Sequence, residues 1–164
     1  MTHTTEDRHA AAREVIRQLG IGENWKAVIE PGMPPGLLGL THGILRAYER
    51  ADLDLLLAQC APDLVITQPP EFPDPQTYTG EEALVDALLD WPRQWDEFRM
   101  EPRRIFAAGD EQIVMVSLHH GRPHSIDIEV EAKVVFLVTF RGATLTRWQM
   151  FLSVDEALEA ARAA

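Results

Sequence analysis

Two adjacent histidines, His119 and His120, are the side chains of this sequence best suited to proton transfer. A histidine titrates with an unperturbed pKa of about 6.5, so it can give or take a proton near neutral pH. The surrounding residues alternate as in a β-strand, so the two side chains point to opposite faces and only one can serve a given site. Alternation groups His119 with Ile113, Met115 and Ser117, and we predict that His119 faces a pocket as a catalytic residue. A histidine at the surface or at the pocket rim is the alternative.

Three carboxylates, Asp127, Glu129 and Glu131, alternate with apolar residues in a later strand-like segment. They share one strand face at intervals of about 6.6–7 Å. If that face is solvated, the acids pair with arginines across the sheet, such as Arg103, Arg104 or Arg122. If it faces a pocket, mutual repulsion raises the pKa of one member into the working range of an acid or base. The solvated arrangement is the more common one.

A metal site could draw only on His119 or His120 together with His124 and Asp127, which lack any recognised ligand spacing. Cys60 is the only cysteine, which excludes an intrachain disulfide and a four-thiolate metal site. The sequence contains no Gly-rich phosphate loop, nucleophile elbow or HExxH run. We therefore expect neither a metal nor another cofactor.

Aromatic side chains suggest a cavity for a flat, mostly apolar ligand. The predicted liners are Trp91, Trp95, Phe136, Trp148 and Phe72. Trp95 is the preferred one, because it lies beyond Pro92, where packing should be less regular. A filled hydrophobic core explains the same residues about as well.

The composition indicates one acidic globular domain of 164 residues. Fifteen Lys and Arg against 26 Asp and Glu give a formal net charge of −11, which disfavours binding to nucleic acid or to an anionic membrane. No stretch approaches the roughly 18 apolar residues of a membrane span, and residues 1–20 lack a signal-type apolar core. We expect a cytoplasmic protein.

Hydrophobic periodicity predicts the order helix, helix, helix, strand, helix, four strands, helix. An N-terminal helical arm (5–19) and a Pro/Gly connector (30–39) make up residues 1–39, and the main domain spans 40–164. Thr41, Asp52, Thr79 and Ser153 are the expected helix caps, and the third core helix should continue past a break at Pro92 to Phe98. The predicted strands are 64–68, 103–108, 112–120, 127–140 and 143–152.

The run VVFLVTF, residues 134–140, is apolar on both faces. A strand buried on both sides needs a helical layer or pocket on one face and a second cover on the other. We predict that a second copy of the chain supplies that cover, so that the protein is a homodimer packed through the sheet.

Four stretches in matching order resemble SnoaL-like members of the nuclear transport factor 2-like superfamily: ILRAYERADLDLLLAQCAPDLVI, PPEFPDPQTYTGEEAL, WDEFRMEPRRIFAAGDEQIVMVSLHHG and VVFLVTFRGATLTRWQMFLSVDEALEAA. The resemblance covers residues 41–161. The resemblance implies an α+β fold in which a curved antiparallel sheet wraps around three core helices into a cone with an apolar pocket. The arm would add an extra N-terminal helix. Relatives include ketosteroid isomerases, polyketide cyclases, dehydratases, epoxide hydrolases and non-catalytic binding proteins.

Isomerase relatives use a Tyr on the first helix, an Asp base at the end of the first strand and a protonated Asp donor on the sheet. The resemblance places these groups near Ile44, at Gln68 and near Phe136, so none of the three is present. Gln68 cannot take a proton at neutral pH. Tyr48, one turn beyond Ile44, remains as a hydrogen-bond donor.

Two functions stay open. In the first, the chain is a cofactor-independent enzyme of cyclase, isomerase or dehydratase type that acts on a small apolar molecule. Gln68 and Tyr48 would orient this substrate, and His119 would transfer a proton. In the second, the chain is a non-catalytic ligand-binding or dimeric interaction protein that lacks the usual catalytic residues.

Overall fold

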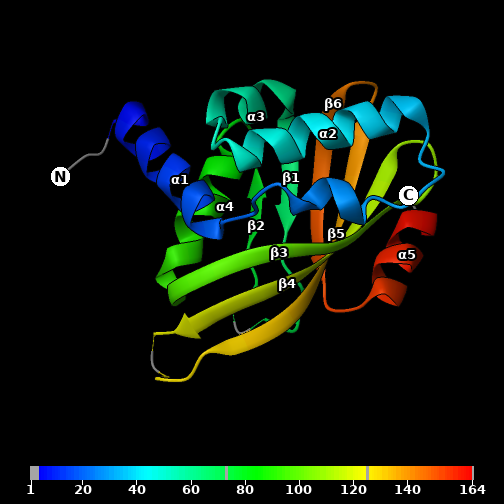
Figure 1. Ribbon diagram of the computed structural model, residues 1–164. Coiled ribbons are helices and arrows are strands. Elements are labelled where there is room, and N and C mark those ends of the chain that lie inside the picture. The colour runs from blue at the N-terminus through cyan, green and yellow to red at the C-terminus, as the bar shows by residue number, and fades with distance from the viewer. Residues whose placement is uncertain (1–3, 73, 125, 164) are drawn as a thin grey trace.

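The structure is a computed structural model that describes residues 4–72, 74–124 and 126–163. One curved six-stranded sheet wraps around helices on its inner side, and a last helix lies on its outer side (Figure 1). The helices are α1 (Thr5–Leu19), α2 (Pro35–Glu49), α3 (Leu53–Gln59), α4 (Ala83–Asp90) and α5 (Val154–Ala163). The predicted α+β class with an additional N-terminal helix is confirmed.

The strands are β1 (Cys60–Thr67), β2 (Thr77–Thr79), β3 (Trp95–Ala107), β4 (Gln112–Pro123), β5 (Val130–Arg141) and β6 (Thr144–Phe151), in the sheet order β2-β1-β6-β5-β4-β3. The meander from β3 to β6 is antiparallel, as the short turns predict. However, β1 runs parallel to β6, so the sheet is mixed rather than purely antiparallel. The chain between β1 and β6 is long enough to return in the same direction, which a hairpin turn does not allow.

Several boundaries differ from the sequence expectation. The stripe through Trp95 and Phe98 is not helical, because α4 ends at Asp90 and Pro92 lies in a short 3₁₀ turn, Trp91–Arg93. Proline cannot donate the backbone hydrogen bond that would continue the helix. The chain therefore enters β3 at Trp95 instead of at residue 103.

Two of the predicted caps are wrong. Helix α2 begins at Pro35, where the missing N–H and fixed φ of proline suit a first helical position. Thr41 is therefore buried inside α2, and its hydroxyl donates to the Leu37 carbonyl at 2.8 Å. Thr79 lies in β2, and no described side chain caps the start of α4. The Ser153 cap is confirmed, since its hydroxyl accepts the Glu156 N–H at 3.2 Å.

Helix α5 covers the convex face of β4 and β5. Val114, Val116, Val135 and Leu137 on that face are all at most 7% exposed, and they pack against α5 around Ala157. The second apolar face of β5 is thus buried within a single chain. The premise that a second copy must cover it is wrong, and the homodimer stays a prediction. Among the described residues, no helix is both long and apolar enough to cross a membrane.

Ala157→Asp should destabilise the fold, because Ala157 is fully buried between α5 and the sheet. A carboxylate placed there has no partner, and we expect the free energy of unfolding to fall by about 3 kcal/mol. Urea denaturation measures the change. The control is Ala163→Asp, at an exposed position of the same helix, for which a change of about 0.5 kcal/mol or less is expected. Equal losses in both variants would show that α5 does not seal the sheet.

Candidate functional site

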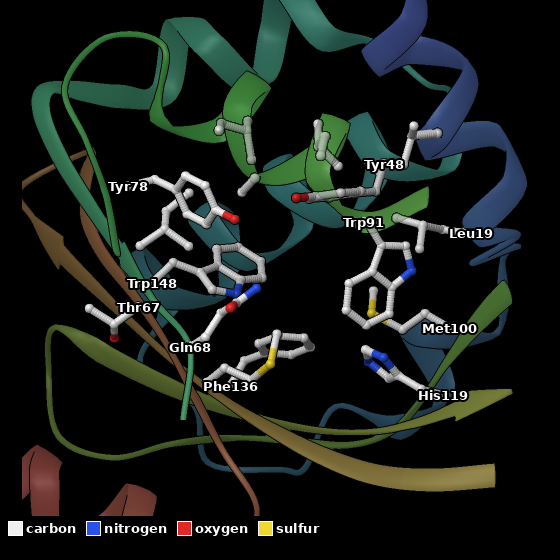
Figure 2. Close-up of a pocket in the computed structure, with 16 residues that line it drawn as sticks. Leu19, Tyr48, Thr67, Gln68, Tyr78, Trp91, Met100, His119, Phe136 and Trp148 are labelled. Carbon is white, nitrogen blue, oxygen red and sulfur yellow. The ribbon is translucent and has the colours of Figure 1, made fainter. Parts of the chain in front are cut away.

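A cavity of about 100 Å³ lies inside the cone, between the concave face of the sheet and helices α1, α2 and α4 (Figure 2). Its walls are mostly aliphatic and aromatic, and every strand of the sheet contributes to them. Among the described residues that line it, none is Asp, Glu, Lys or Arg. Tyr48, Gln68, Tyr78 and His119 direct hydrogen-bonding groups toward its interior.

His119 occupies the concave face of β4, as alternation predicts, and its side chain lines the cavity. The residue is only 5% exposed, with its ring edge-on to Trp91 at 5.3 Å and tilted against Phe136 at 5.8 Å between ring centroids. Its Nε2 atom is buried and has no hydrogen-bond partner among the described residues. Burial, with a smaller effect from neighbouring His120, lowers the pKa of His119 to about 4. The imidazole is therefore neutral at pH 7, with an unused hydrogen-bonding atom.

Tyr48 projects from α2 into the same cavity, beside Trp148 at 6.2 Å between ring centroids. Burial, with a smaller effect from Cys60, raises the pKa of its hydroxyl. The hydroxyl therefore stays protonated, and it makes no hydrogen bond to a described residue. It can donate a hydrogen bond to a ligand but does not serve as a base.

Gln68 lies just beyond β1, and its side chain reaches the cavity from the side opposite His119 (Figure 2). The Gln76 N–H donates to Gln68 Oε1 at 3.0 Å, and Gln76 O accepts the Gln68 N–H at 3.1 Å. Because its carbonyl oxygen is engaged in this way, the amide NH₂ group remains as a donor toward a ligand.

Tyr78 also lines the cavity, although its sequence did not indicate such a position. The expected helix cap at Thr79 puts Tyr78 in a loop, whereas β2 places its ring in the cavity wall. The hydroxyl donates to Asp90 Oδ2 at 2.6 Å, so its oxygen can only accept from a ligand. Alternation of buried and exposed residues in Thr77–Thr79 is the one local signal, and three residues are too few to establish it.

The predicted aromatic liners separate into two groups. Trp91, Phe136 and Trp148 line the cavity. Trp95 does not line it, but stacks on Trp91 at 5.8 Å and packs over Gly121, where a Cβ atom would lie 2.5 Å from its ring. Phe72 lies on a separate open groove beside polar residues of the loop and of the segment after α4.

The three carboxylates are solvent-exposed, as in the solvated alternative. The predicted strand over 127–140 is wrong at its start, because β5 begins at Val130, so only Glu131 lies in a strand. Of the three, only Glu131 reaches a basic side chain among the described residues, with its Oε2 atom 3.3 Å from His120 Nδ1. The other ring nitrogen of His120 lies 3.4 Å from Glu101. The predicted arginine partners pair elsewhere: Arg103 with Glu101, Arg104 with Glu30 and Arg122 with Glu97.

His124 is also outside the cavity. It is exposed and pairs with Asp96, whose hydrogen bond raises the pKa of His124. Within the part of the chain that the structure describes, no group of three or more His, Cys, Asp or Glu could hold a metal ion.

Residues 42–148 match the model of the SnoaL-like domain family. An NTF2-like protein from Burkholderia xenovorans LB400 aligns over 79% of this chain and 98% of its own, with 25% identity and a TM-score of 0.60. A Mycobacterium tuberculosis protein in complex with estradiol-17β-hemisuccinate covers 74% of this chain and 95% of its own, at 20% identity and TM-score 0.52. A Mesorhizobium loti protein described as a SnoaL-like polyketide cyclase covers 70% and 97%, at 15% identity and TM-score 0.53. The comparison with curated proteins found no match.

The stability of the protein should depend on pH through His119. The unfolded histidine takes a proton below pH 6.5 but the folded one only below about pH 4, so the unfolded state holds more protons between these values. The free energy of unfolding therefore falls by about 3 kcal/mol as the pH is lowered from 6.5 toward 4. Urea denaturation across this range should show the loss in the wild type and in His120→Leu, and not in His119→Leu. An identical pH dependence in wild type and His119→Leu would contradict the burial of a neutral imidazole.

Proposed function

The chain belongs to the SnoaL-like domain family, and from this premise we propose that its cone binds a small, uncharged, mostly apolar molecule. The observation that carries the proposal is His119 Nε2, a buried polar atom at the wall of an apolar cavity that has no partner in the described part of the chain. An unsatisfied buried polar group destabilises a protein by about 1–3 kcal/mol. A ligand that hydrogen-bonds to it recovers part of that free energy.

The absence of charge in the cavity wall supports an uncharged ligand. No described lining residue carries a formal charge at neutral pH, because His119 is held neutral by its surroundings. A charged group buried in this cavity would lose its hydration without gaining an opposite charge. Any charged group of the ligand would therefore have to remain outside the cavity, in contact with water.

The hydrogen-bonding groups support a ligand with a hydroxyl or carbonyl group. Tyr48 offers a hydroxyl donor and Gln68 an amide donor, while the neutral His119 ring offers one donor and one acceptor. Phe136, Trp148 and the other rings provide flat apolar surface around them. The arrangement suits an aromatic or alicyclic ring that carries an oxygen function.

The second candidate is an acid/base enzyme. It is favoured by the presence in one cavity of Tyr48 and His119, whose hydroxyl and Nε2 atom make no hydrogen bond to a described residue. A general base works best when its pKa lies near the working pH. The pKa of His119, about 4, makes it a weak proton acceptor at neutral pH. Ligand binding is therefore the better-supported function. An enzyme that relied on His119 as its base would keep its rate down to about pH 5 and lose it below the pKa near 4.

Two adjacent histidines on opposite strand faces provide a matched test of the binding proposal. Native mass spectrometry of the protein purified from its source should show a retained small molecule. Calorimetric titration with phenol, a single ring with one hydroxyl, should give saturable binding that is about fivefold weaker in His119→Leu. His120→Leu, which changes the convex face, should bind phenol like the wild type.

Absence of both a retained molecule and saturable phenol binding would contradict ligand binding in the cone. Equal weakening by the two substitutions would instead show that His119 does not contact the ligand.

A further inference from the structure

We infer that helix α1 is a fixed wall of the ligand cavity and that Leu19 limits the uncharged ligand to a single ring. The inference rests on the proposed function, because it concerns the same cavity. Val15 and Leu19 both line the cavity, yet they precede residue 42, where the family match begins. The matched family domain is therefore not the complete binding site of this chain.

Polar contacts hold the first half of α1 against α4. Helix α1 lies beside α4 (Figure 1). Arg8 forms an ion pair with Asp86, and His9 Nε2 lies 3.4 Å from Glu82. Such partly exposed pairs contribute little free energy individually. Both pairs join the first half of α1 to α4.

Apolar burial holds the second half of α1. Ile16 is 1% exposed and Leu19 7% exposed, and both belong to the main hydrophobic core. After Gly20 ends the helix, Trp25 is fully buried, and its Nε1 donates to Glu49 of α2 at 3.2 Å. Because both ends of this segment are anchored, α1 is a built-in wall rather than a loosely attached arm.

The position of Leu19 gives it control over ligand size. It lies beside Trp91, across the cavity from Gln68 and Trp148 (Figure 2). The cavity volume is about 100 Å³, whereas an engineered apolar cavity of about 150 Å³ accepts benzene. One ring therefore fits after a small displacement of the lining side chains. Two fused rings fit only if a lining side chain is replaced by a smaller one.

The test compares Leu19→Ala with Ile16→Ala in the full chain. Both substitutions remove buried carbon atoms from α1, but only Leu19 lines the cavity. Calorimetric titrations with phenol and 1-naphthol give the ratio of their dissociation constants for each variant. We expect Leu19→Ala to shift this ratio about tenfold or more toward 1-naphthol relative to the wild type, and Ile16→Ala to leave it within about twofold.

Leu19→Phe adds volume to the same wall and should abolish phenol binding, which keeps the inference testable if Leu19→Ala does not fold. Binding of 1-naphthol by Leu19→Ala but not by the wild type would also support the inference that Leu19 limits the size of the ligand. An unchanged ratio in Leu19→Ala, or unchanged phenol binding in Leu19→Phe, would overturn the inference and leave the proposed function intact. Failure of every variant and of the wild type to bind either probe would overturn the proposed function itself.

Discussion

The register of β4 in the sheet is the constraint on which the rest of the structure depends. Side chains of a strand alternate between its two faces. A shift of the pairing register by one residue therefore moves every side chain of the strand to the opposite face of the sheet. In the observed register His119 pairs with Ala132 and faces the cavity, while His120 pairs with Glu131 on the outside. The shifted register would place His120 in the apolar interior and Val114 on the wrong face of the sheet. The large apolar surface on both faces thus selects one arrangement of polar groups.

The main parts of the fold follow from local sequence patterns. Period-two alternation and short turns predict the antiparallel meander, and they also predict that His119 faces the cavity. The strand end at Gln68 and the helical position of Tyr48 place both side chains in the cavity wall. His119 lies within a strand whose side chains alternate, so periodicity determines its direction. Gln68, just beyond β1, and Tyr48 are instead located through the family resemblance.

The remaining parts of the site depend on contacts between distant segments. Trp95 shares the apolar character of Trp91, but the start of β3 turns it onto Gly121, outside the cavity. The parallel pairing of β1 with β6, the cover that α5 gives the sheet and the role of α1 in the wall have no local signature. The lowered pKa of His119 likewise comes from burial by surrounding elements, so it follows from the fold and not from the neighbouring residues.

The contribution of α1 to the cavity has a practical consequence for ligand discovery. A chain trimmed to the matched segment, residues 42–148, would lose Val15 and Leu19 along with α5. Its cavity would be open on one side, and newly exposed apolar surface would attract hydrophobic compounds without selectivity. Hits from a screen of that shortened chain would describe a different receptor, so screening libraries and docking calculations need the full length of the protein.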